Sequence, residues 1–222
     1  MNAGRLTRLI LFMAALSIPA FADITLDFSG GGSGPANNIS GTATTLTASN
    51  ILIDTLLAIG GLNPGTHAVT NSGALAINAT GGSYSGGLYT YTGGTYDITG
   101  CVTGVAITGC PGTAQALLTG TISSLTVNLV TGRLILANGN DTKNIGLVNY
   151  FVGVGSPNVW EFMGGSTHLA SITNTVVGGA YTATSFSTDI PNDYVPEPAS
   201  ILLLGTVVLG VTRLARRRVT KA

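Results

Sequence analysis

Short runs of alternating apolar and polar residues fill the middle of the chain. In residues 23–28, Ile24, Leu26 and Phe28 fall on one face and the polar residues on the other, which is typical of a half-buried β-strand. Glycines separate the runs, as expected of turns between strands. The central runs lie at 74–79, 88–92, 95–99 and 102–108. We therefore expect an all-β domain, a Gly/Thr-rich antiparallel β-sandwich, with a β-solenoid or a barrel as the alternatives.

The second half of the domain continues this pattern. Residues 116–130 fit two strands or one bent strand, and three apolar residues in a row within 133–137 predict a strand buried on both sides. Asn138-Gly139-Asn140-Asp141 is the strongest hairpin-turn signal. Residues 51–59 fit a capped helix or a strand, and the neighbouring strands favour the strand. Further strands are expected at 146–154, 159–163, 168–172 and 181–187.

The N-terminus has the pattern of a secretory signal peptide. Arg5 and Arg8 precede an apolar stretch at 9–18, and Ala20 and Ala22 supply the small residues of a cleavage site. We expect residues 1–22 to be removed, with the cut after Ala22. The alternative is an uncleaved anchor, which so short an apolar stretch disfavours.

The C-terminus combines a proline motif, an apolar segment and a basic end. The two prolines of Val195-Pro196-Glu197-Pro198 favour an extended backbone, although Pro198 can also be the first residue of a helix. The uncharged stretch 199–212 that follows is the basis of a predicted transmembrane helix at 199–214, and the stretch 198–214 would span about 26 Å as a helix. The arginines place the tail in the cytoplasm and the body outside. They are Arg213, Arg216, Arg217 and Arg218. A helix buried in the core would leave them unexplained.

These last residues, 195–222, resemble the PEP-CTERM sorting signal of Gram-negative-type bacteria. The resemblance implies recognition and cutting by an exosortase, a protease-transpeptidase of the membrane. It implies export, transient anchoring in the inner membrane, and delivery to the cell surface or the extracellular matrix. It says nothing about the activity of the exported body, residues 23–194.

The net charge of the exported body limits the classes of partner that it can bind. The chain as a whole is neutral, yet seven of its nine cationic residues lie in the two terminal segments. Residues 23–194 hold eight acidic residues against Arg133 and Lys143, a net charge of −6. Nucleic-acid binding needs a cationic surface and is therefore not expected.

Two further residue classes have structural interpretations. Cys101 and Cys110 are the only cysteines, and in an exported protein this spacing predicts a disulfide. A catalytic cysteine would need a basic partner, and none is near in sequence. Tyrosines cluster around the central strands and could stack on sugars, but packing between strands is the favoured interpretation. These tyrosines are Tyr84, Tyr89, Tyr91 and Tyr96.

The sequence offers little for catalysis. There is no Gly-x-Ser-x-Gly motif, and His67 and His168 each lack an acidic neighbour. Asp141, with its flanking asparagines, could form a calcium loop, but a turn is the better interpretation. By elimination, the carboxylates of a hydrolase would be Asp54, Asp97 and Glu161.

We therefore expect a non-enzymatic protein without a cofactor or metal, with a structural or adhesive role in a biofilm or exopolysaccharide. Its expected partners are the exosortase and the exopolysaccharide. A secreted hydrolase of extracellular polymer is the alternative.

Overall fold

The structure is a computed structural model that describes residues 24–32, 38–162, 164–174 and 176–194. Asp23–Val195 forms a compact unit distinct from the two chain ends. The predicted signal peptide, the proline motif, the transmembrane helix and the arginines lie outside the described residues. Within the described part of the chain, no helix is long and apolar enough to span a membrane.

The described part consists of thirteen strands and one short helix. The all-β antiparallel class predicted from the sequence is therefore confirmed. The elements are β1 (Thr25–Gly31), β2 (Ile39–Gly41), β3 (Leu46–Leu52), β4 (Thr55–Ile59), β5 (Gly65–Thr80), β6 (Ser83–Ser85), β7 (Leu88–Tyr91), β8 (Gly93–Val102), β9 (Gln115–Asn128), β10 (Arg133–Lys143), α2 (Ile145–Phe151), β11 (Trp160–Phe162), β12 (Gly165–Asn174) and β13 (Tyr181–Tyr194).

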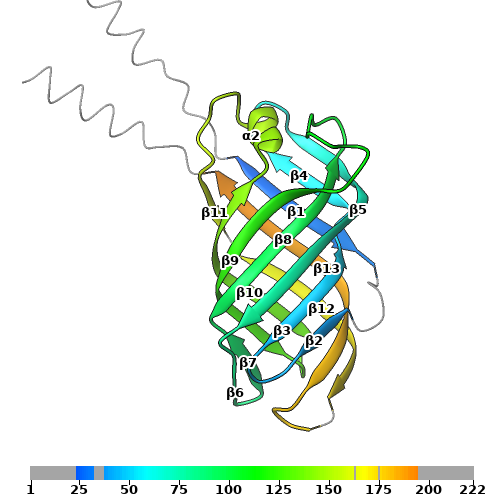
Figure 1. The fold of residues 1–222 in the computed structure, drawn as a ribbon, viewed down its shortest axis with the longest axis vertical. Helices are drawn as coiled ribbons and strands as arrows, with labels where there is room; N and C mark the ends of the chain where they lie inside the picture. Colours follow the sequence, from blue (N-terminus) through cyan, green and yellow to red (C-terminus); the bar gives the residue numbers. More distant parts are fainter. Residues whose placement is uncertain (1–23, 33–37, 163, 175, 195–222) are drawn as a thin grey trace, which may run out of the picture. The chain divides into compact units, whose positions relative to one another are not determined.

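The strands form one sheet that closes on itself, not the two sheets of the expected sandwich (Figure 1). The ring runs β1–β4–β5–β8–β9–β10–β12–β13, and β13 pairs with β1 to close it. Strands β2 and β3 fill the gap between β13 and β5 along the other part of those two long strands. Of the predicted architectures, the barrel alternative is therefore the closest to the structure. The sequence pattern did not distinguish it from the sandwich, because alternation along a strand indicates the two faces of a sheet but not how the sheet closes.

Apolar side chains fill the inside of this closed sheet. Along β1, Leu26 and Phe28 are fully buried and alternate with partly exposed polar residues, as the sequence pattern predicted. Among the four tyrosines of the central strands, three are buried and Tyr84 is half-buried, which favours the packing interpretation. The three are Tyr89, Tyr91 and Tyr96.

Two inward rings lie across glycines of a neighbouring strand. A Cβ atom on Gly120 of β9 would overlap the ring of Tyr96 on β8, with which it pairs. A Cβ atom on Gly41 of β2 would overlap the ring of Tyr181 on β13 in the same way. These two glycines therefore provide the space for large aromatic side chains inside the sheet.

The predicted hairpin turn at Asn138-Gly139-Asn140-Asp141 is wrong. Strand β10 runs through these residues, and its register against β9 shifts on either side of Asn138. The turn lies earlier, at residues 129–132, where the Asn128 carboxamide oxygen accepts hydrogen bonds from the N–H groups of Val130 and Thr131. The asparagine and glycine residues form an irregular, bulged stretch of the strand instead.

The strand predicted at 146–154 is also wrong, because helix α2 occupies most of it. Asn144 caps the helix, with its side-chain oxygen 2.9 Å from the N–H of Gly146. Leu147, Val148 and Phe151 bury the inner face of the helix, at a spacing that suits a helix. Figure 1 shows α2 across one end of the sheet.

Two ambiguous stretches of the sequence resolve as strands. Residues 51–59 are divided between the end of β3 and the whole of β4, with a break at Ile53 and Asp54. Most of residues 116–130 lies in one long strand, β9.

Candidate functional site

The two ends of the folded body lie side by side. The N–H of Tyr194, the last residue of β13, donates a hydrogen bond of 2.7 Å to the carbonyl oxygen of Ile24. Both residues are buried, Tyr194 at the end of β13 and Ile24 just before β1. In the sequence, only Val195 separates Tyr194 from Pro196. The proline motif therefore begins almost directly after the packed body.

The predicted disulfide is present. Cys101 near the end of β8 is bonded to Cys110 in the following loop, with 5.7 Å between their Cα atoms. The side chain of Asn71, at a bulge of β5, donates a hydrogen bond to the carbonyl oxygen of Pro111. The disulfide thus holds the β8–β9 loop against the sheet.

The three carboxylates proposed for a hydrolase are not brought together. The backbone carbonyl of Asp54 accepts a hydrogen bond from the N–H of Val69 on β5. Asp97 on β8 instead lies opposite Ala76, and Ala76 is roughly 20 Å from Val69 along β5. Glu161 lies on β11, which pairs with β13. Burial raises the pKa of Asp97. These positions do not form the pair of acids that glycoside hydrolysis requires.

Other acidic residues are neighbours in the fold, although no pattern in the sequence indicated this. Asp27 on β1 and Asp189 on β13 interact on the outer face of the sheet. Burial and the neighbouring Asp189 raise the pKa of Asp27 to about 6. Further along, Glu161 lies opposite Asp193, which accepts a 2.5 Å hydrogen bond from the Thr25 hydroxyl. These acids form a strip across β1, β13 and β11.

Asp141 is part of a buried ion pair, not of a calcium loop. Its Oδ1 atom lies 2.6 Å from Nζ of Lys143, and both side chains have no exposed surface. The Lys143 ammonium also lies 4.9 Å from the ring centroid of Trp160. Burial lowers the pKa of Lys143 to about 8, although Asp141 acts in the opposite direction. Burial likewise raises the pKa of Asp141, which Lys143 counteracts.

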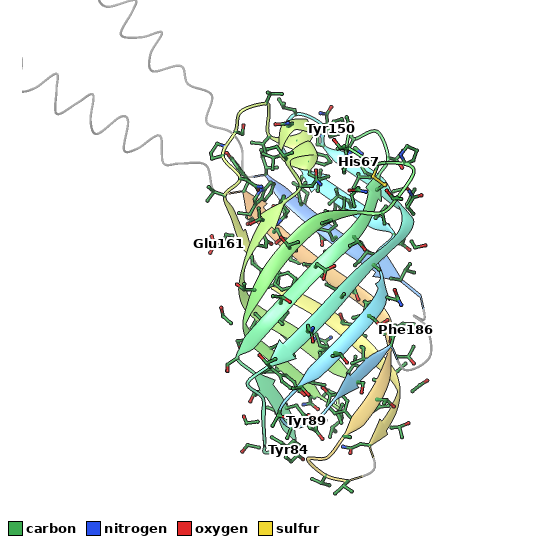
Figure 2. The ribbon with its side chains drawn as sticks, in the orientation of Figure 1. His67, Tyr84, Tyr89, Tyr150, Glu161 and Phe186 are labelled. Atoms are coloured by element: carbon green, nitrogen blue, oxygen red, sulfur yellow. A yellow bond between two sulfur atoms is a disulfide. The ribbon has the colours of Figure 1, made fainter. Side chains whose placement is uncertain are left out.

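The two histidines lie in different surroundings. His67 on β5 contacts Tyr150 of α2 edge-to-face, with their ring centroids 5.8 Å apart (Figure 2). It contacts Phe151 of the same helix edge-to-face at 5.1 Å. His168 on β12 is exposed on the outer face, opposite Arg133. Among the described residues, no group of three or more His, Cys, Asp or Glu side chains could hold a metal ion.

Comparison with known proteins identifies the C-terminal segment. Residues 195–218 match the PEP-CTERM protein-sorting motif. The predicted sorting residues, from Val195 to Arg218, lie within this match. No curated protein and no solved structure matches the chain.

The sorting motif indicates how the chain is exported and processed. It supports an exported surface protein that an exosortase processes at the membrane. The match begins at Val195, directly after the last described residue of the body, Tyr194, and it does not include any residue of the sheet. The arrangement of the body must therefore be interpreted from its own contacts.

Proposed function

We propose that this protein is a non-catalytic structural or adhesive component of a bacterial extracellular matrix, delivered by exosortase cleavage within its sorting motif. The observation that carries the proposal is the match of residues 195–218 to the motif. In this proposal, residues 1–22 are a signal peptide that starts export. The helix at 199–214 and the four arginines hold the chain in the inner membrane until cleavage.

The position of the motif supports this processing. Strand β13 ends at Tyr194, and the first proline of the motif, Pro196, lies two residues later. A cut at or after Pro196 therefore removes no residue of the closed sheet. The hydrogen bond between Tyr194 and Ile24, which joins the end of β13 to the start of the body, would remain after cleavage.

The composition and packing of the body support a structural role. Its interior is filled by apolar and tyrosine side chains, and a disulfide closes one loop. Only 8% of all residues in the chain are charged. A closed sheet also leaves few unpaired strand edges, which limits uncontrolled edge-to-edge pairing outside the cell.

Deletion and complementation test the role. A strain without the protein should form a matrix of lower cohesion, and the full chain should restore it. A chain that ends at Tyr194 should be secreted into the medium but should not restore cohesion, because it lacks the sorting motif. Full cohesion of the deletion strain, with the protein present in the wild-type matrix, would contradict the structural role.

A further inference from the structure

An exposed phenylalanine lies on the outer face of the sheet, beside a histidine and an arginine. Phe186 of β13 is 56% exposed, and Figure 2 shows it on the outer side of the ribbon. His168 of β12 and Arg133 of β10 are exposed as well. The three residues lie on three adjacent strands.

A bulge brings Phe186 beside His168. On β12, His168 and Leu169 are consecutive, whereas their partners on β13, Ser187 and Ser185, are separated by Phe186. Phe186 and Ser187 therefore face His168 together. Bulges of this kind redirect a side chain, and here the extra residue is a large aromatic one that points outward.

The bulge is held in place from both sides. Asn38, which is buried, accepts a hydrogen bond from the N–H of Ser185 at 3.0 Å and donates one to its hydroxyl at 2.8 Å. The carbonyl oxygen of Phe186 accepts a hydrogen bond from the N–H of Gly32 at 3.0 Å. The backbone under Phe186 is thus fixed before any ligand arrives, which lowers the entropic cost of binding.

Arg133 completes the row on the other side of His168. The two residues are direct partners in the pairing of β10 with β12, so their side chains leave the sheet about 5 Å apart. Between residues 24 and 194 the sequence has only two Lys or Arg residues, and the other, Lys143, is buried in its ion pair. Arg133 is therefore the only one of the two that can meet an anionic ligand in solution.

We propose that Arg133, His168 and Phe186 form a binding site for a polysaccharide that contains uronic acids. The ring of Phe186 packs against the apolar C–H face of a sugar, and the Arg133 guanidinium forms a forked pair of hydrogen bonds with the sugar carboxylate. His168 lies between them, within reach of a hydroxyl group. Two strand spacings, about 10 Å, separate the aromatic residue from the cation.

The surrounding charge defines the orientation of the ligand. Asp189 lies two residues from Ser187 along β13 and opposite Ser166, on the same outer face. Its carboxylate repels a uronate and accepts hydrogen bonds from neutral sugar hydroxyls. The ligand carboxylate is therefore directed towards Arg133, and the net charge of −6 keeps the affinity of a single site modest. Many copies in one matrix would strengthen the attachment through multivalency.

This site deepens the proposed function, because it assigns the class of polymer that a matrix protein would hold. The test uses the purified full-length protein in detergent and measures binding of oligogalacturonate, with malto-oligosaccharides of equal length as the neutral probe. Oligogalacturonate should bind, and the neutral probe should bind more weakly. Arg133→Gln and Phe186→Ser should each weaken oligogalacturonate binding about tenfold or more.

Val130→Ser is the matched control, because Val130 is a 90% exposed apolar residue in the turn before Arg133 but is not one of the three binding residues. It should leave binding unchanged. All variants should melt at the wild-type temperature, since the substituted side chains are exposed.

Absence of oligogalacturonate binding, or equal binding by Arg133→Gln and wild type, would overturn the proposal. Equal affinity for the neutral probe would overturn the uronate class. The two failures are distinguishable. If only the binding site is wrong, the deletion strain still loses matrix cohesion, whereas failure of the proposed function leaves the cohesion of the deletion strain unchanged.

Discussion

Lys143 Nζ lies 2.6 Å from Asp141 Oδ1 inside the closed sheet, and neither side chain is exposed. Removing only one charge would leave the other buried without a partner. Asp141→Leu should therefore destabilise the protein by about 3–5 kcal/mol. The double variant Asp141→Leu/Lys143→Met should recover most of this loss, because no charge remains buried. Denaturant unfolding measures both, and a double variant no more stable than Asp141→Leu would contradict the account.

The space above Gly120 is taken by the ring of Tyr96, so a methyl group at this position has no room. Gly120→Ala should cost about 1–3 kcal/mol of the free energy of unfolding. Gly31→Ala is the matched control, since a Cβ atom at this exposed strand position meets nothing within 4 Å. Equal unfolding midpoints for the two variants would show that the predicted overlap is absent.

Asp27 gives the protein a pH-dependent stability. Burial and Asp189 raise the pKa of its carboxyl group from 3.8 to about 6, so the folded state binds more protons than the unfolded state between these values. The contribution of Asp27 to stability is therefore full below pH 3.8 and is lost as the pH rises through 6. Melting temperatures of wild type and Asp27→Asn should differ in a pH-dependent way. The wild type should lose stability relative to Asp27→Asn from pH 4 to pH 7, and a constant difference would contradict this assignment.

The disulfide between Cys101 and Cys110 closes a short loop. Replacing both cysteines with serine should lower the free energy of unfolding by about 2–3 kcal/mol, because the unfolded chain gains freedom. Thiol labelling of the unreduced, exported wild-type protein should modify neither cysteine. Labelling of both would show that the bond does not form outside the cell.

The proline motif should be required for release from the membrane. Replacing Pro196, Glu197 and Pro198 with alanine should leave the protein in the inner-membrane fraction, because the exosortase would no longer recognise it. Thr212→Ser, a mild change within the same segment, should leave the distribution unchanged. Surface delivery of the triple-alanine variant at wild-type levels would contradict this role of the motif.

Much of the fold could be predicted from local pattern, and the errors have physical causes. Alternation along residues 23–28 correctly identified the buried side chains of β1. The turn was misplaced because Asn128 fixes the chain at 129–132 with two side-chain hydrogen bonds, although Asn138-Gly139 has the stronger turn composition. The helix at Ile145–Phe151 was missed, although its cap, Asn144, is visible in the sequence.

The pairing of strands that are far apart in the sequence could not be predicted from local sequence pattern. The closure of the sheet depends on β1 and β13, which come from opposite ends of the body. Arg133, His168 and Phe186 are likewise far apart in sequence, and only strand register and one bulge make them neighbours. The sorting motif differs in this respect, since its residues are contiguous and need no fold to be recognised.

Processing within the sorting motif is the central claim, and the intact mass of the protein recovered from the cell surface or the matrix tests it most directly. The account predicts a chain that begins at Asp23 and ends near Pro196–Pro198, without the four arginines. A surface-located protein that retains the arginine-rich tail would contradict it.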